Sequence, residues 1–242
     1  MSEVYVYQTV HTLGGTPLFP EAHAAALDAA SRALFGRPFR TDPRQLAARI
    51  GALAKAEKAP DDLSAFVRME LSPEGTLTLR YTGLSLYRGY ELRSLRPEAL
   101  TFVYDLPFGE YPNSAGEALG ALARVQAARG GARCVVRCGT DGAVRTADDA
   151  PLFAVAGRTV LTCPAAGSVE RSAAAACIEA AGLQLTEEPF SRDELPQFDE
   201  LFAFDHRGVT SLAKCDGNPY ISLAAERVAR AAKRLSLKIL GM

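Results

Sequence analysis

The sequence predicts a two-domain protein of the α/β (α+β) class, and three observations carry this prediction. Its 242 residues suffice for two domains, each with its own core. Segments that alternate apolar and polar residues, as strands do, are interspersed with segments of helical spacing. A Pro- and Gly-rich break over residues 107–113, PFGEYPN, separates the two halves. We therefore expect an N-terminal α+β domain over 1–108 and a C-terminal α/β domain over 109–242.

The first half reads as a hairpin, two helices and several strands. Residues 4–10 alternate like a strand, and Gly14-Gly15 forms the turn into a second short apolar run. Helical spacing follows, and three further strands complete the unit. The helices are expected over 21–34 and 43–58, and the strands over 66–72, 76–86 and 100–106. His11, in the hairpin, is expected to be exposed.

The second half begins with a helix over 114–129, closed by Gly130-Gly131. Ser114 and Glu117 have the spacing of a capping box, in which hydroxyl and carboxylate satisfy free amides of the first turn. The later elements are likewise predicted from apolar periodicity and from the glycines that end helices. They are a strand over 133–139, a hairpin over 151–162, a helix over 167–182, short strands, and a closing helix over 222–238.

Composition narrows the class of partner. Lys plus Arg total 27 and Asp plus Glu total 28, so no basic surface for nucleic acid is indicated. No apolar run approaches the roughly 20 residues that cross a bilayer. Five irregularly spaced cysteines and a start without a signal-peptide pattern favour a cytoplasmic protein. We expect the partners to be small molecules or a second copy of the chain.

Residues 190–217, FSRDELPQFDELFAFDHRGVTSLAKCDG, carry the clearest family resemblance. Together with the colinear order of elements from Asn113 onward, this segment resembles the class IV fold of pyridoxal-phosphate (PLP) enzymes. That family includes branched-chain and D-amino-acid aminotransferases and aminodeoxychorismate lyase. The resemblance implies a two-domain D-amino-acid aminotransferase-like fold and a homodimer. The matching positions are Ser191, Arg192, Leu195, Asp199, Glu200, Phe202, Thr210, Asp216 and Gly217.

The resemblance places the family's PLP lysine at Asn113 when the chains are aligned on Leu119. An amide cannot form a Schiff base. Asn113 could therefore neither bind the cofactor aldehyde covalently nor transfer a proton at the substrate carbon. The five lysines of the chain fit solvated helix faces or a strand position that the family does not use. They are Lys55, Lys58, Lys214, Lys233 and Lys238.

Three further family anchors differ in the same alignment. The pyridinium partner, a Glu in the family, falls near Thr146, and a phosphate-binding Arg falls at Ala26. The Gly-Ile-Thr phrase at the phosphate helix becomes Ser-Val-Glu over 168–170, where a carboxylate repels phosphate. Of the phosphate ligands only Thr210 is retained. From these positions we expect no PLP, no other cofactor and no metal.

Arg68 and Thr210 are the candidate ligand-binding residues. Arg68 matches a Tyr-x-Arg pattern whose Arg receives the substrate carboxylate in the family, a task suited to its planar fork. An exposed strand Arg beside Glu70 or Arg80 is an equally good interpretation. A small carboxylate-bearing molecule is the ligand that the first interpretation implies.

His206, Cys163 and His23 are candidate catalytic residues. His206 could act as an acid or base oriented by Asp205, although a solvated turn is the simpler interpretation. Cys163 precedes a helix N-terminus, which lowers thiol pKa values, but no base is assigned to it. His23 begins a helix that lies near the active site in the family, and a neutral structural His is the plainer alternative.

Three functions remain open at this stage. The favoured hypothesis is a class IV-like protein that is not a transaminase: a small-anion-binding homologue, or a cofactor-independent enzyme that uses the inter-domain cleft. The second is a PLP-dependent aminotransferase or aminodeoxychorismate lyase with a misaligned site. The third is a non-catalytic regulatory or structural subunit.

Overall fold

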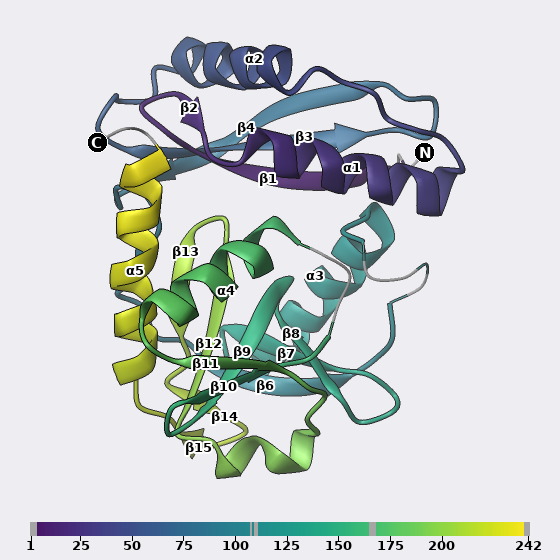
Figure 1. Ribbon diagram of the computed structural model, residues 1–242. Coiled ribbons are helices and arrows are strands. Elements are labelled where there is room, and N and C mark those ends of the chain that lie inside the picture. The colour runs from purple at the N-terminus through teal and green to yellow at the C-terminus, as the bar shows by residue number, and fades with distance from the viewer. Residues whose placement is uncertain (1–3, 107, 109–110, 165–167, 240–242) are drawn as a thin grey trace.

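The chain forms two lobes in the computed structural model, which describes residues 4–106, 108, 111–164 and 168–239. The N-terminal lobe comprises residues 4–85, and the C-terminal lobe comprises residues 91–239. Figure 1 shows the first as a sheet with helices packed against it, lying above the second, a larger curled sheet with helices around it. This mixed architecture confirms the predicted fold class.

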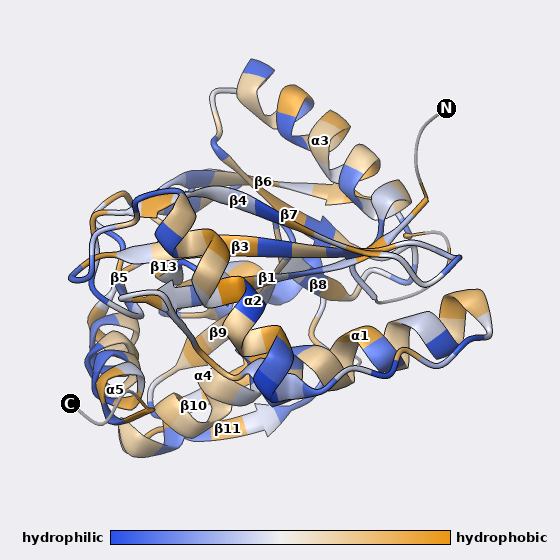
Figure 2. Cartoon of the chain, turned by 90° about the horizontal axis from the view of Figure 1, so that it is seen from above, coloured by the Kyte–Doolittle hydropathy of each residue, from blue (hydrophilic) through white to orange (hydrophobic). Residues whose placement is uncertain are grey.

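The N-terminal lobe is a four-stranded antiparallel sheet in the order β2-β1-β3-β4. Its strands are β1 (Val6–Leu13), β2 (Thr16–Pro17), β3 (Ser64–Leu71) and β4 (Leu77–Ser85). Two amphipathic helices, α1 (Pro20–Phe35) and α2 (Pro43–Ala56), pack their apolar residues on this sheet. Figure 2 shows hydrophilic and hydrophobic residues interspersed along both helices, as expected for a covering layer.

The C-terminal lobe is built on an eleven-stranded sheet. Its main path runs β15-β14-β6-β7-β8-β9-β12-β13-β5, with β10 and β11 branching from β9. The strands are β5 (Glu91–Leu92), β6 (Glu98–Val103), β7 (Cys134–Cys138), β8 (Val144–Ala147), β9 (Ala150–Ala156), β10 (Thr159–Thr162), β11 (Gln184–Glu187), β12 (Glu200–Asp205), β13 (Gly208–Ser211), β14 (Lys214–Cys215) and β15 (Asn218–Pro219).

Three α-helices and a 3-10 helix, Arg192–Gln197, cover this sheet. The helices are α3 (Ser114–Arg129), α4 (Val169–Ala180) and α5 (Leu223–Ile239). The predicted helices are thus confirmed to within about two residues at each end, the difference expected from fraying. None of the helices in the described part of the chain is long and apolar enough to cross a membrane.

Two strands that precede the predicted domain boundary belong to the second sheet. Strand β6 runs parallel to β7, with Ala99 opposite Cys134, and β5 runs parallel to β13. The parallel pairing of β6 with β7 requires a crossover, which α3 supplies. The division into 1–108 and 109–242 stays a prediction, because sheet pairing alone does not define folding units.

Backbone hydrogen bonds join the lobes near the start of α3. The Tyr7 amide donates to the Pro112 carbonyl at 3.0 Å, and the Ser114 amide donates to the Tyr5 carbonyl at 3.0 Å. Val6 and Asn113 form an isolated antiparallel bridge between these bonds. The segment leading into α3 is therefore an added edge of the N-terminal sheet.

Candidate functional site

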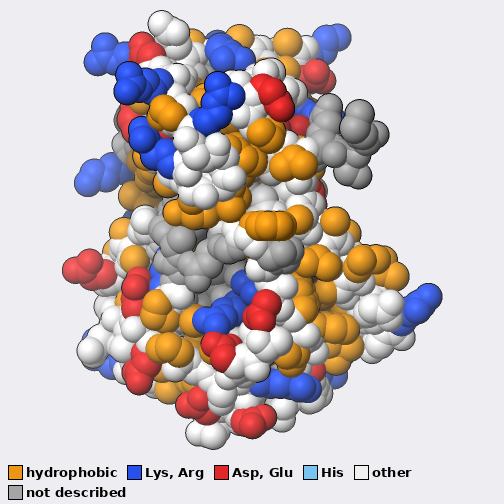
Figure 3. All heavy atoms as spheres, turned by 90° about the vertical axis from the view of Figure 1, so that its right-hand side faces the viewer, with side chains coloured by type: hydrophobic (Ala, Val, Ile, Leu, Met, Phe, Trp, Pro, Cys, Tyr) orange, Lys and Arg blue, Asp and Glu red, His pale blue; other side chains and the backbone are white. Residues whose placement is uncertain are grey.

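A cavity of about 390 Å³ lies between the lobes and takes walls from both. Residues of β1 and β3 form one wall, and residues of β8, the start of α4 and the turn after β12 form the other. Figure 3 shows basic and acidic side chains gathered on the lower part of the molecule, below the level at which its upper and lower parts meet. Such a polar cleft between two lobes is the usual place for a small-molecule site.

Arg68 lines this cavity, but its guanidinium is already occupied. Its Nη1 donates to Glu117 Oε1 at 2.8 Å and its Nη2 to Glu117 Oε2 at 2.6 Å, a bidentate pair. Its Nε lies 3.0 Å from Glu70, and its Cζ lies 3.8 Å from the Tyr7 ring centroid. Arg68 thus joins β3 to α3, and a ligand carboxylate would have to displace Glu117 to reach it.

The predicted capping box at the start of α3 is wrong for the same reason. Glu117 turns toward Arg68, and the Tyr5 hydroxyl also donates to it at 2.8 Å. The N-cap is Asn113, whose Oδ1 accepts from the Gly116 amide at 2.9 Å. A charge-assisted bidentate pair competes successfully with a local amide for the carboxylate.

His206, one of the candidate catalytic residues, lines the cavity. Burial lowers its pKa to about 4, so the ring is neutral at physiological pH. Its backbone carbonyl accepts from His11 Nδ1 at 2.7 Å, and His11 Nε2 in turn accepts from the Ser64 hydroxyl at 2.6 Å. The expectation that His11 is exposed is wrong: only 1 % of it is accessible, because it joins the two lobes from inside.

Glu170 supplies an unusual carboxyl to the cavity. It lies in the first turn of α4, and burial raises its pKa to about 7. No basic side chain among the described residues forms an ion pair with it. Near neutral pH this carboxyl is therefore divided between its acid and its carboxylate form, and it can either donate or accept a proton.

The other arginines of the cavity all have carboxylate partners. Arg124 lies 3.5 Å from Asp149, Arg145 lies 2.5 Å from Asp141, and Arg171 lies 3.2 Å from Glu187. Arg207 Nε donates to Asp205 at 2.7 Å. Five arginines and five acidic residues line the cavity, so its formal charge is balanced. Such a lining attracts a phosphate dianion less than an unpaired arginine cluster would.

A second, smaller pocket of about 60 Å³ adjoins the first. Asn113 borders it, and both ends of the Asn113 amide are used locally: Nδ2 donates to the Tyr111 carbonyl at 2.9 Å. Arg137 of β7 also lines it, next to Tyr104. The pocket shares part of its lining with the main cavity, including Tyr7, Glu117, Thr146 and Asp149.

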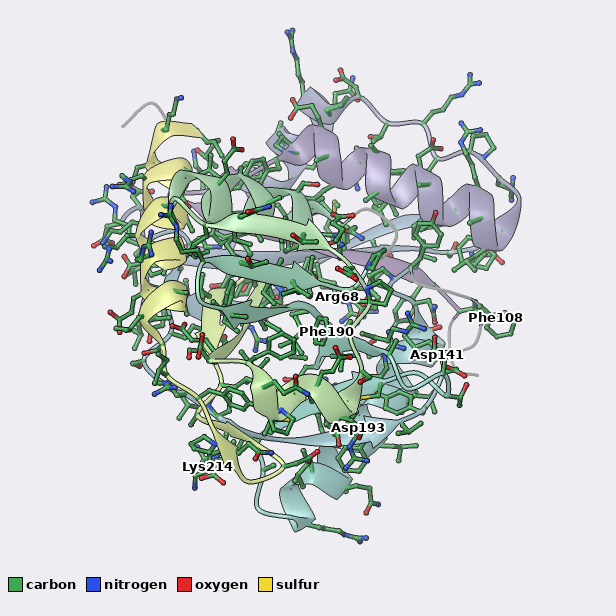
Figure 4. All side chains as sticks on the ribbon, turned by 60° about the horizontal axis from the view of Figure 1, so that its bottom comes forward. Arg68, Phe108, Asp141, Phe190, Asp193 and Lys214 are labelled. Carbon is green, nitrogen blue, oxygen red and sulfur yellow. The ribbon has the colours of Figure 1, made fainter. Side chains whose placement is uncertain are left out.

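The structure brings together several positions that the family alignment singled out. Thr146, Ala26, Ser168 and Glu170 border the main cavity, and Asn113 borders the small pocket. None of the five lysines, all of them in the described part of the chain, lines either pocket. Lys214 pairs with Glu98 at 3.0 Å and lies far from Arg68 in Figure 4.

Three sequence-predicted candidates lie outside the cavity lining. His23 is fully buried on α1, with Nδ1 3.3 Å from Gln8 Oε1, and burial lowers its pKa to about 3. Cys163 is buried, and its Sγ accepts from Arg145 at 3.3 Å. Thr210 is half-buried on β13, opposite Ala203.

Sequence reasoning missed the pairing of Glu117 with Arg68 and the presence of Arg137, Asp148 and Asp149 beside the pockets. Arg137 alternates with buried Val136 and Cys138 on a strand, which marks it as facing the other side of the sheet. That alternation was the only sequence signal for it.

Comparisons with known proteins agree with the fold. The family model described as amino-transferase class IV matches residues 5–204. A putative branched-chain amino acid aminotransferase from Thermotoga maritima superposes with a TM-score of 0.80 at 16% identity, covering 97% of this chain and 86% of that one. The PLP-bound form of a hypothetical aminotransferase from Mycobacterium tuberculosis gives 0.78 at 19% identity, with 97% and 89% covered. A putative 4-amino-4-deoxychorismate lyase from Legionella pneumophila gives 0.75 at 14% identity, with 90% and 85% covered. No curated protein matches the sequence.

These comparisons overturn the expectation that the chain has no cofactor. The class IV match and the PLP-bound neighbour structure indicate a PLP-binding fold. Covalent attachment is a separate question, because a Schiff base needs a lysine amine and neither pocket has one. The residues present do not fit a covalently held PLP, and we assign no reaction step to it.

Proposed function

The chain belongs to the class IV aminotransferase family, and from that premise we propose that it binds a small carboxylate-bearing molecule between its lobes without a Schiff base to the protein. PLP itself is one candidate ligand, bound non-covalently. Lysine-dependent transamination is not the function that the site supports best. The ligand class is supported by the polar lining of the cavity and by Arg137 of the adjoining small pocket, which makes no ion pair within the described residues.

One observation carries this proposal: the chain's five lysines all lie away from both pockets. The family position of the PLP lysine aligns with Asn113, whose amide is held by Tyr111 and Gly116 at 2.9 Å on each side. A side chain fixed in this way caps a helix and is not free to react. We therefore propose that the cavity binds its ligand non-covalently.

Glu170 favours a second candidate function, acid–base catalysis that needs no Schiff base. A carboxyl whose pKa is raised to about 7 can both take and return a proton near neutral pH. His206 lines the same cavity as a neutral imidazole and would accept a proton from the substrate. This function applies if the bound molecule carries a transferable proton within reach of either group.

Borohydride reduction tests the main proposal. Purified protein is titrated with PLP, reduced with borohydride and digested, and the lysine peptides are weighed by mass spectrometry. We expect saturable binding of PLP or of simple carboxylates, with no pyridoxyl group on any of the five lysines at stoichiometric PLP. A single lysine labelled in full, with amino-acid-dependent spectral changes, would overturn the proposal in favour of a PLP-dependent aminotransferase or lyase.

We also propose that the protein is a cytoplasmic homodimer. The resemblance to the class IV family supports the dimer, and the irregular spacing of the five cysteines supports the compartment. Light scattering after size-exclusion chromatography should give twice the 25.8 kDa chain mass. A monomer at micromolar concentration would contradict the dimer, and a stable complex with an active relative would favour the regulatory-subunit alternative.

A further inference from the structure

Arg137 differs from the arginines of the main cavity in having no partner. It lies on β7 beside Thr146 of β8, and its side chain lines the small pocket. Within the described residues its guanidinium makes no ion pair and no hydrogen bond, whereas each of the five arginines in the main cavity is paired. The Arg137 guanidinium, whose N–H donors are unpaired, therefore faces the small pocket.

The acidic groups nearest to Arg137 are engaged elsewhere. Asp105 accepts from the Thr140 hydroxyl at 2.5 Å and from the Thr140 amide at 3.2 Å. Asp149 pairs with Arg124. Both carboxylates act on Arg137 only at a distance, and burial lowers the pKa of its guanidinium. A half-buried cation without a counter-ion is unfavourable, and an entering anion would relieve that cost.

The small pocket has the size and lining of a subsite for one carboxylate. Its volume of about 60 Å³ exceeds the 10–15 Å³ or so that one water needs, and is too small for a ring. Tyr7 and Tyr104 line it as well, and burial raises the pKa of both phenols, so their hydroxyls stay protonated. Because the two pockets share part of their lining, the body of a ligand can lie in the main cavity.

We propose that Arg137, and not Arg68, binds the carboxylate of the ligand, with the carboxylate in the small pocket and the remainder of the molecule in the main cavity. The inference rests on the proposed function and adds the anchoring residue to it. Arg68 instead serves to join the lobes through Glu117. The protein would then select ligands by the distance between their carboxylate, which lies in the small pocket, and the rest of the ligand, which lies in the main cavity.

Calorimetric titration with benzoate and with its neutral isostere benzamide tests this assignment. Wild-type protein should bind benzoate at least tenfold more tightly than benzamide, because charge-assisted hydrogen bonds to Arg137 require the anion. Arg137→Gln should lose that preference, and Arg137→Lys, which keeps the charge but not the fork, should retain part of it. Arg133→Gln is the matched control: Arg133 is exposed just before β7, and its replacement should change neither affinity.

The outcomes separate the two proposals. If Arg137→Gln keeps the preference for benzoate while Arg68→Gln loses it, the assignment to Arg137 is overturned and the proposed function stands. If wild-type protein binds no carboxylate in a series that runs from acetate through benzoate to PLP, both are overturned. Thermal unfolding of each variant shows that it is folded. Should Arg137→Gln fail to fold, Arg137→Lys decides: a reduced preference for benzoate supports the assignment, and an unchanged preference overturns it.

Discussion

Arg68 and Arg137 lie on different sheets, line adjoining pockets and have opposite surroundings. Arg68 is held by Glu117 and Glu70 and stacks on Tyr7, so all its interactions are internal. Arg137 has the same chemistry and no partner among the described residues. The difference teaches that bordering a cavity does not make a cation available to a ligand: the pairing inside the protein decides.

The same contrast separates the two walls of the main cavity. In the N-terminal wall Arg68 is tied to specific partners, and so are His11 and Ser64, which lie on the same two strands but outside the cavity lining. In the C-terminal wall Glu170 has no cationic partner, and the phenol of nearby Tyr90 is buried without a hydrogen bond. Buried polar groups that lack partners cost stability, and proteins retain such groups most often at functional sites.

Removing His11, on the well-paired N-terminal side, should have the largest effect on stability. His11→Ala deletes two hydrogen bonds, leaves the Ser64 hydroxyl without its acceptor and opens a cavity, so the free energy of unfolding should fall by about 3 kcal/mol. Urea unfolding measures it. His23→Ala is the control, because His23 is equally buried but has a single hydrogen bond, at 3.3 Å. Equal losses in the two variants would mean that the hydrogen bonds of His11 contribute little.

Neutralising Glu170 should stabilise the protein in a pH-dependent way. Burial raises the pKa of Glu170 to about 7, so the folded state keeps the proton while the unfolded state loses it near 4.5. The stability that this group contributes therefore falls as pH rises from 4.5 through 7. Glu170→Gln should raise the free energy of unfolding by roughly 1–3 kcal/mol at pH 8 and leave it unchanged at pH 4. Exposed Glu179 on the same helix is the control, and a gain that is constant with pH would contradict the assignment.

Breaking the Arg68–Glu117 pair should free the two terminal nitrogens of Arg68, while Glu70 still holds its Nε. Glu117→Gln should lower the free energy of unfolding by about 1–2 kcal/mol, less than for a fully buried pair, because a third of the Glu117 side chain is exposed. The freed guanidinium should then bind a second benzoate. A double-mutant cycle with Arg68→Gln measures the coupling. Coupling near zero, with no second benzoate, would show that the pair does not determine the availability of Arg68.

The smallest expected effect belongs to Asn113, which tests whether its role is that of a helix cap. Asn113→Ala should lower the free energy of unfolding by about 1 kcal/mol, because the Gly116 amide loses its acceptor. Asn113→Asp keeps that acceptor and should retain most of the stability in the same urea experiment. If both variants lose equally, the side chain does not act through the cap.

Local structure was predictable from the sequence where short-range chemistry determines it. The limits of α3 follow from the cap at Asn113 and the stop at Gly130-Gly131, and Cys134 and Cys138 are buried as their strand pattern indicates. The class IV resemblance, carried largely by residues 190–217, gave the fold class correctly.

Pairings between distant residues were not predictable in this way. Glu117 chooses Arg68, 49 residues away, over the amide beside it, and His11 is buried because it reaches the turn at His206. The expectation about the cofactor failed for a related reason. A single aligned residue reports on one contact, whereas binding in a cavity depends on all groups that line it.

The backbone bridge between β1 and the segment before α3 bears on how fast a ligand exchanges. Opening the cleft by a hinge at residues 112–114 would break the hydrogen bonds of Tyr5 and Tyr7 to that segment. Rotation of side chains at the entrance breaks no backbone bond and takes nanoseconds or less. Ligand release should therefore be set by the strength of the bound contacts, with no slow rearrangement of the lobes in the kinetics.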